Sequence, residues 1–309
     1  MRTSAGKEPK QVDAKGQTPR GKDSLRLRLA SAAIGLPLLL VLILAGPAFT
    51  LALAAAATLL GLWELYRLAG VQHLWRLRLP GFVLGLALIA GGWYAQANLL
   101  AALAALSPIA ILLAHRWIPQ ALRPWLMMVA GPLYLGATLA HGVLLRGWTS
   151  GAQMQLYGRH FPLPLPDVLL RRLDMGSELL LLALLSTFAV DTAAFFVGRT
   201  IGRHRLASRI SPGKTWEGAI GGLAGGIAAT TGLTLLFGLP LALWEAMLLG
   251  GILGIVGQAG DLMESAIKRA HQAKDAGGLI PGHGGILDRL DSVVYNLVVV
   301  YHFSSWGIV

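Results

Sequence analysis

Long stretches without a charged residue constrain this chain more than any other feature. Residues 29–63 and residues 79–114 contain no Asp, Glu, Lys or Arg. An α-helix needs about 20 apolar residues to cross the hydrocarbon core of a membrane, so each run suits two crossings. Charged residues make up only 13% of the 309 residues, against about 25% in soluble proteins. The sequence therefore predicts an integral membrane protein.

Breaks within the apolar runs set the expected number of helices. Gly46-Pro47 interrupts the first run, and a polar segment at residues 96–98 interrupts the second. Further crossings are predicted at residues 124–145, 179–197, 218–260 (two helices that fold back at 238–240) and 293–309. We therefore expect an all-α integral membrane protein, a polytopic bundle of about nine transmembrane helices.

Basic residues predict the orientation. With the N-terminus inside, most of the 26 Lys and Arg residues fall in cytoplasmic segments, as the positive-inside bias requires. In so apolar a chain, the net charge of +11 indicates cytoplasmic loops and anionic lipid headgroups, and we expect no nucleic-acid partner. The chain has no cysteine, which excludes disulfides, thiolate metal sites and a cysteine nucleophile.

Three regions are expected from this pattern. Residues 1–24 are polar and rich in Lys and Gly, and they are predicted to form a disordered basic cytoplasmic tail rather than a signal peptide. Residues 25–178 would hold the N-terminal transmembrane helices, with an outside loop at residues 146–178. Residues 179–309 would form a C-terminal catalytic transmembrane region.

Two polar segments interrupt the apolar pattern of the C-terminal region, and the first suits phosphate binding. It begins at Asp191 and includes Arg199. It ends in a cluster of hydroxyl, basic and acidic residues: Ser211, Lys214, Thr215 and Glu217. Lys, Arg, hydroxyl groups and backbone N–H groups are common donors to phosphate. The alternative is an ordinary positive-inside loop in which Ser211 caps the next helix. The glycine spacing of a Walker A loop is absent.

Asp191 stands inside one of the predicted crossings. An ionisable residue in a spanning helix is costly unless it is paired or hydrated, so a functional role is expected for it. A simple ion pair with Arg199 or with a neighbouring helix is the alternative.

The second polar segment mixes carboxylates with basic residues: Asp261, Glu264, Lys268, Arg269, Lys274, Asp275, Asp288, Arg289 and Asp291. On a helix, the i+3 and i+4 spacing gives Asp261, Ser265, Lys268 and Arg269 one shared face, and Asp288 and Asp291 share a face in the same way. Two aspartates one turn apart, just after Gly284-Gly285, suit Mg²⁺, which binds one or two carboxylates plus substrate phosphates. Asp288 as a cap of the last helix, and His283 as a loop residue without a catalytic task, are the alternatives. No histidine spacing supports a zinc site.

These polar segments resemble a known family. The pattern comprises Ser265, Ile267-Lys268-Arg269, Lys274-Asp275, Pro281, His283-Gly284-Gly285-Ile286 and Asp288-Arg289-Leu290-Asp291, preceded by Asp191-Thr192, Gly198-Arg199, Ser211-Pro212 and residues 214–218. It is similar to the defining motif of phosphatidate cytidylyltransferases (CDP-diacylglycerol synthases), over residues 186–292. Phe195 stands where that family commonly has an aromatic residue, often tyrosine.

The resemblance implies an enzyme that transfers the cytidylyl group of CTP to phosphatidic acid, giving CDP-diacylglycerol and pyrophosphate for phospholipid biosynthesis. It also implies Mg²⁺ on Asp261, Asp288 and Asp291, with a second cation left open, and a homodimer. The expected location is the bacterial cytoplasmic (inner) membrane, with the active site on the cytoplasmic face. Phosphatidate is already an anionic nucleophile near neutral pH, because the second pKa of a phosphomonoester is about 6, so no strong general base is needed.

Residue roles follow from the same match. The expected catalytic residues are Asp261, Asp288, Asp291, Lys268, Arg269 and His283. The expected substrate-binding residues are Asp191, Arg199, Ser211, Lys214, Thr215, Glu217, Ser265, Lys274, Asp275, Gly284, Gly285 and Arg289. Two rival classes stay open: a secondary transporter for an anionic substrate, and a lipid kinase or cytidylyl enzyme that acts on another lipid alcohol or phosphate.

Overall fold

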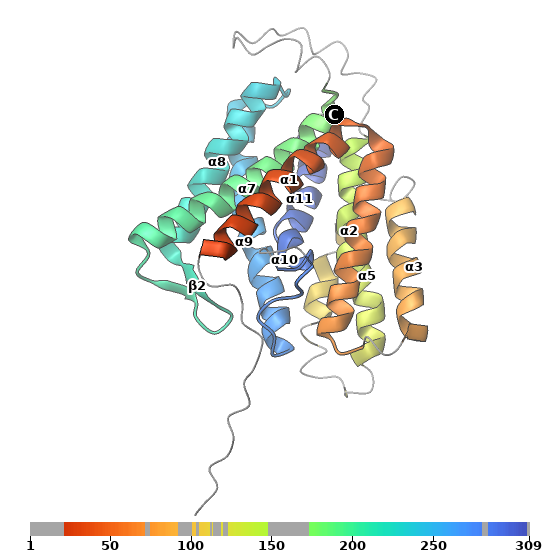
Figure 1. The fold of residues 1–309 in the computed structure, drawn as a ribbon. Helices are drawn as coiled ribbons and strands as arrows, with labels where there is room; N and C mark the ends of the chain where they lie inside the picture. Colours follow the sequence, from red (N-terminus) through yellow and green to blue (C-terminus); the bar gives the residue numbers. More distant parts are fainter. Residues whose placement is uncertain are drawn as a thin grey trace, which may run out of the picture.

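The computed structural model describes residues 22–71, 75–91, 101–102, 105–111, 113, 119, 123–147, 173–279 and 284–307. These residues are mostly helical (Figure 1). In chain order the helices and strands are α1 (Lys22–Leu44), α2 (Pro47–Leu68), α3 (Trp75–Gly91), α5 (Arg123–Arg146), α7 (Met175–Ile201), β1 (Arg205–Ala207), β2 (Ser211–Thr215), α8 (Trp216–Phe237), α9 (Leu243–Ala270), α10 (Leu287–Leu290) and α11 (Val293–Gly307). The short β1–β2 hairpin was not expected from the sequence.

Five of the described helices are long and apolar enough to cross a membrane: α2, α5 (from Trp125), α7, α8 and α9. Two further apolar helical segments are shorter, Ala33–Leu44 in α1 and Arg78–Gly91 in α3. The helical membrane class is therefore confirmed, whereas the number of nine crossings stays a prediction. Residues 1–21 of the predicted tail and residues 148–172 of the predicted outside loop lie outside the described residues, and α1 already begins at Lys22.

The predicted breaks between helices are confirmed where the structure describes them. Gly46 has φ of 127° and precedes Pro47, which begins α2 at a position where a missing N–H group costs nothing. Gly238 ends α8 in the left-handed conformation, with φ of 68°, and its N–H group donates to the Thr234 carbonyl. Both turns need a residue that tolerates positive φ, which glycine does.

The helices form two groups that α11 joins (Figure 1). In one group α5 packs against α2 and α3, and in the other α8 packs against α7 and α9. Helix α11 contacts α5, α7 and α9. The site described below lies where the second group meets the start of α11.

Glycines allow close packing of α7, α8 and α9. A Cβ atom on Gly222 of α8 would lie 3.0 Å from Ala194 Cβ and 3.1 Å from the Val190 carbonyl oxygen, both on α7. One turn later on the same face of α8, a Cβ atom on Gly226 would lie 2.8 Å from Val190 Cγ2 of α7 and 2.9 Å from the Gly250 carbonyl oxygen of α9. In a membrane, where lipid tails are as apolar as side chains, such small residues let helices associate through close backbone contact.

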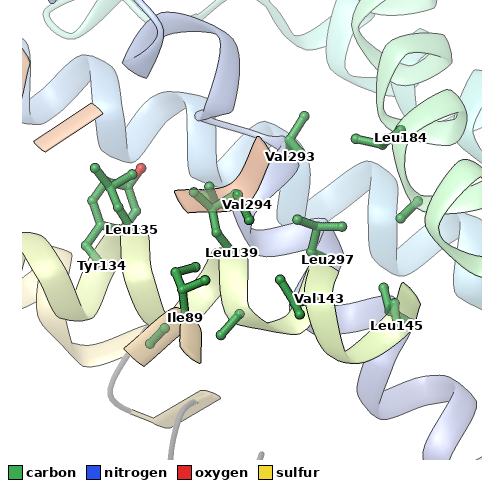
Figure 2. Packing of buried hydrophobic residues seen from close by; sticks show 14 of the residues in the cluster. Ile89, Tyr134, Leu135, Leu139, Val143, Leu145, Leu184, Val293, Val294 and Leu297 are labelled. Carbon is green, nitrogen blue, oxygen red and sulfur yellow. The ribbon is translucent and has the colours of Figure 1, made fainter. Parts of the chain in front are cut away.

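The apolar core surrounds α5, which is buried over most of its length. Figure 2 shows Leu139 and Val143 of α5 near Leu297 of α11, with Ile89 of α3 and Leu184 of α7 on either side. This packing joins the two groups of helices and so holds the segment before α11 against the rest of the bundle.

Three helix ends meet at the opposite end from the site. Arg146, the last residue of α5, donates to the Ile43 carbonyl near the end of α1 and pairs with Asp174, where the Nη1 to Oδ2 distance is 2.6 Å. Asp174 in turn caps α7, because its Oδ1 atom accepts from the Ser177 N–H group at 2.8 Å. The ends of α1 and α5 and the start of α7 are therefore close together, which matches the alternating directions expected for successive crossings.

Candidate active site

The polar segments of α7, β2, α9 and the α10–α11 junction converge at one end of the bundle. Asp191 lies on α7 and Lys214 on β2, directly before α8. Helix α9 continues to Ala270, beyond the end at residue 260 that the apolar pattern predicted, so Asp261 and Lys268 lie on the same uninterrupted helix. Asp291 stands between α10 and α11.

Three carboxylates, those of Asp261, Glu264 and Asp291, lie together at this end of the bundle and are called the carboxylate centre below. Ligand oxygens of Asp261, Glu264 and Asp291 all lie within 4.8 Å of one another. Asp261 and Glu264 are three residues apart on α9, which places them one above the other on a helix. Glu264 is 0% exposed, and its Oε1 atom has no hydrogen-bond partner among the described residues. This group of oxygens could hold a metal ion, and hard cations prefer such ligands.

Two lysines flank the three carboxylates. Lys214 Nζ lies 2.8 Å from Asp261 Oδ2 and also donates to the Gln258 carbonyl at 3.3 Å. Lys268 Nζ lies between Glu264 Oε2 at 2.5 Å and Asp288 Oδ1 at 2.7 Å. Both ammonium groups are mostly enclosed, so they are screened by water less than surface charges are. Positive donors beside a carboxylate centre suit a substrate that carries several phosphates.

Asp288 takes a different place from the one expected. It is not part of the group of three carboxylates, where Glu264 stands instead. Its carboxylate accepts from Lys268, from the Gly285 N–H group at 2.8 Å and from the Ala276 N–H group at 3.2 Å. Asp288 therefore binds two loop segments to α9 and does not cap α11. Burial acts to raise the pKa of Asp288, but the Lys268 and Gly285 hydrogen bonds outweigh it and hold the pKa below its usual value.

Asp291 is a partly buried aspartate of the site. Burial, joined by the nearby charge of Asp261, raises its pKa well above the ordinary value of an aspartate. A carboxylate that is costly to ionise in isolation is stabilised when a cation binds beside it. Its Oδ1 atom also accepts from the following Ser292 N–H group at 2.7 Å, which fixes the side chain at the start of α11.

Asp191 lies near the same centre and does not pair with Arg199 on its own helix. It lies within electrostatic range of Asp261, Lys214 and Arg289, which come from three other elements. The Arg199 guanidinium instead lies over the Phe195 ring, 5.9 Å from the ring centroid. Asp191 therefore belongs to the site by position, and the simple Asp191–Arg199 pair is not what the described residues show.

The β1–β2 hairpin and the start of α8 make mainly structural contacts. Thr215 caps α8, because its hydroxyl accepts from the Gly218 N–H group at 3.1 Å, so the alternative that Ser211 caps this helix is wrong. Ser211 is the first residue of β2. Glu217 accepts from the backbone N–H groups of Arg203 and His204 and holds the turn between α7 and β1.

The remaining predicted residues lie around the centre. Ser265 donates to Asp261 Oδ1 at 3.4 Å, and Arg269 donates to the Ile210 carbonyl of the hairpin at 3.1 Å. Lys274 and Asp275 are exposed in the segment after α9. Gly284 has φ of 85°, and a Cβ atom there would lie 2.8 Å from Asp288 Oδ2. His283 lies outside the described residues.

Two residues that sequence reasoning did not assign take part in this end of the protein. Glu264 replaces Asp288 among the three carboxylates, and its spacing of three residues from Asp261 was a usable signal. Glu64 of α2 accepts from the Leu287 N–H group at 2.8 Å, although the two residues are 223 positions apart.

Known proteins are similar in sequence to this chain. A phosphatidate cytidylyltransferase of Brucella melitensis is 48% identical over 120 residues, which is 38% of this chain and 43% of the Brucella protein. That of Bacillus subtilis is 39% identical over 133 residues, 43% of this chain and 49% of that protein. Phosphatidate cytidylyltransferase 4, chloroplastic, of Arabidopsis thaliana is 34% identical over 279 residues, 87% of this chain and 70% of that protein.

The extent of these similarities differs. The matched segments span less than half of the length of the two bacterial relatives, whereas the plant match covers most of this chain. The model of the Cytidylyltransferase family matches residues 26–306, a range that includes both groups of helices and all the residues of the site. The chain therefore belongs to the cytidylyltransferase family.

Proposed function

We propose that this protein transfers the cytidylyl group of CTP to phosphatidic acid and forms CDP-diacylglycerol and pyrophosphate. One observation carries the proposal: three carboxylates, flanked by Lys214 and Lys268, lie at one end of a bundle of membrane-spanning helices. The proposed reaction requires that a nucleotide reach that position from water and a lipid headgroup from the membrane. The relatives named phosphatidate cytidylyltransferase support the choice of substrates.

The reaction needs little from a general base. A phosphatidate oxygen attacks the α-phosphorus of CTP, a new P–O bond forms, and the bond to the β-phosphate oxygen breaks to release pyrophosphate. The phosphomonoester is largely a dianion at neutral pH, because its second pKa is about 6. Positioning and neutralisation of charge then supply most of the rate, as in other phosphoryl-type transfers.

Lys214 and Lys268 are suited to that task. Each ammonium group already stands beside a carboxylate, so each is held in place rather than free to swing into water. An ordered positive charge costs no reorganisation when negative charge develops on the phosphates. We assign Lys214 and Lys268 to the triphosphate and the lipid phosphate, with Arg289 beside Asp191 as a further donor.

The residues present fit Mg²⁺. The three carboxylates offer only oxygen ligands, and the buried Glu264 Oε1 atom has no hydrogen-bond partner among the described residues. We propose Asp261, Glu264 and Asp291 as the residues that hold the ion. Asp191 lies within electrostatic range of Asp291, and we propose it as a further acidic residue for a second cation. When bound, Mg²⁺ would supply neutralisation of phosphate charge.

The setting of the enzyme is proposed from its charge pattern and its family. The basic segments next to the site favour the cytoplasmic face of a bacterial inner membrane, where CTP is present. A homodimer is proposed from the resemblance of the motif to the family pattern.

A labelled-nucleotide assay tests the function and its rivals. Purified protein in detergent is given phosphatidic acid and CTP labelled on either the α- or the γ-phosphorus. We expect α-label in lipid only with phosphatidate and Mg²⁺, and none after EDTA treatment. Transfer of the γ-label to lipid would identify a lipid kinase. Incorporation of the α-label only with a different lipid phosphate would show that phosphatidic acid is not the substrate. Turnover in fully chelated buffer would contradict the metal site, and an Asp261→Asn protein is the inactive control.

A further inference from the structure

Glu64 is an acidic residue in a membrane-spanning helix, outside both polar segments of the C-terminal region. It lies one turn before the end of α2 and is only 3% exposed. Its neighbours Leu62 and Leu65 along the helix are fully buried. An ionisable side chain in such a place is costly and marks a function unless its partners explain it.

The Glu64 carboxylate lies between two loop segments of the C-terminal region. Its Oε2 atom accepts from the Leu287 N–H group at 2.8 Å, at the first residue of α10. A Cβ atom added to Gly277 or to Gly285 would collide with this carboxylate. The Oε1 atom is buried and has no hydrogen-bond partner among the described residues. The two glycines therefore leave a space that the carboxylate fills.

The contact reaches the carboxylate centre through a short chain of bonds. Leu287, which Glu64 holds, directly precedes Asp288, and Asp288 pairs with Lys268 of α9. One turn later Asp291 enters the group of three carboxylates. Helix α10 is thus fixed by α2 on one side and by α9 on the other, and it carries Asp291 between them.

We propose that Glu64 is a positioning residue that sets the place of Asp291 in the cation site, so that the N-terminal helices take part in the site. This inference rests on the proposed function, because it assigns a role toward the same cation. Glu64 acts through Leu287 and the short helix α10 and does not itself touch the three carboxylates. Residues that orient metal ligands typically change metal affinity by about 10–100-fold when they are replaced.

The test measures Mg²⁺ binding without turnover. The thermal unfolding midpoint of the purified protein is followed as Mg²⁺ is added, and the concentration that gives half of the stabilisation is recorded. For Glu64→Ala we expect that concentration to rise by about tenfold or more. Glu64→Gln keeps an oxygen that can accept from Leu287, so its value should stay closer to wild type. Thr58→Val is the control, because it removes a buried hydroxyl from the same helix, α2.

A pair of glycine variants tests the same contact from the other side, and the two single variants suffice if Glu64→Ala folds poorly. Gly277→Ala places a Cβ atom against the Glu64 carboxylate, whereas Gly278→Ala meets nothing within 4 Å. We expect only Gly277→Ala to weaken Mg²⁺ binding, and the Glu64→Ala/Gly277→Ala double variant to be no weaker than Glu64→Ala. Effects of contacting residues combine in this non-additive way, and those of independent sites add.

The outcomes separate the inference from the proposed function. A Glu64→Ala protein that unfolds at a lower temperature but keeps the wild-type Mg²⁺ concentration would show a merely structural role and overturn the inference. Fully additive effects of Glu64→Ala and Gly277→Ala would also overturn it. A wild-type protein that Mg²⁺ does not stabilise would refute the cation site and the inference together. A wild-type protein that binds Mg²⁺ but incorporates no CTP would refute only the proposed function.

Discussion

Gly260 offers a sharp test of how closely α9 and α11 must approach. It is the residue before Asp261, and a Cβ atom there would lie 2.6 Å from the Asp291 carbonyl oxygen and 2.5 Å from Tyr295 Cδ2. Ordinary carbon contacts are about 3.5–4 Å, so Gly260→Ala must separate the two backbones by about 1 Å. That movement pulls Asp291 away from Asp261 and Glu264, the other members of the carboxylate centre.

The loss of stability in Gly260→Ala can be estimated by comparison with a matched glycine variant on the same helix. Gly251→Ala places its Cβ atom 4.0 Å from Ile227, which is ordinary contact. Both alanines gain about 1 kcal/mol of helix propensity, so this gain cancels between the two variants. The remaining difference is the cost of overpacking at Gly260, about 1–3 kcal/mol. Misplacement of reacting groups by about 1 Å can reduce turnover by about 100-fold.

Two measurements on the same protein preparation decide the outcome. Thermal unfolding in detergent should place Gly260→Ala below Gly251→Ala, and labelled-CTP turnover should fall strongly in Gly260→Ala alone. Equal stability and equal turnover in the two variants would refute the close approach of Asp291 to α9 on which the site depends.

Three further predictions concern the cap of α8, the opposite end of the bundle and the orientation. Thr215→Ala should lower the free energy of unfolding by about 1 kcal/mol, and Thr215→Ser should restore most of it, as measured by unfolding in denaturant. Partial burial acts to raise the pKa of Asp174, but its hydrogen bonds from Ser177 and Arg146 hold the pKa below its usual value. Its contribution to stability is therefore present above the ordinary pKa of about 4 and is lost as the pH falls through the lowered value, so the stability gap between wild type and Asp174→Asn should close in acid. Because the chain has no cysteine, Arg205→Cys and Gln272→Cys can be labelled without background, and both should react with an impermeant maleimide only from the cytoplasmic side.

Local signals in the sequence predicted much of the fold. The breaks at Gly46 and Gly238 were predictable because positive φ and helix termination depend on the residue itself. The β1–β2 hairpin was not predictable, since its strands are too short to show an alternating pattern. The hairpin is held by distant groups such as Arg269, which donates to the Ile210 carbonyl.

Most residues of the site could be predicted from the sequence, but the contacts between their side chains could not. The sequence placed Asp261 and Asp291 in one polar segment, and the structure brings their carboxylates together with that of Glu264. It could not indicate that Lys268 would engage Asp288, because that contact depends on how the loop after α9 folds back. In the sequence, Glu64 is only a single charged residue at the end of an apolar run. Its contact with Leu287 could not be predicted, because the two residues are 223 positions apart.

We propose above that Asp261, Glu264 and Asp291 hold a divalent cation, while Asp288 fixes the loop beside them. Anomalous diffraction from crystals grown with Mn²⁺ tests it most directly, because Mn²⁺ accepts the same oxygen ligands as Mg²⁺. We expect an anomalous peak bounded by the carboxylates of Asp261, Glu264 and Asp291, with Asp288 still paired to Lys268. A peak bounded by Asp288 and Asp291 without Glu264, or no peak at this end of the bundle, would contradict it.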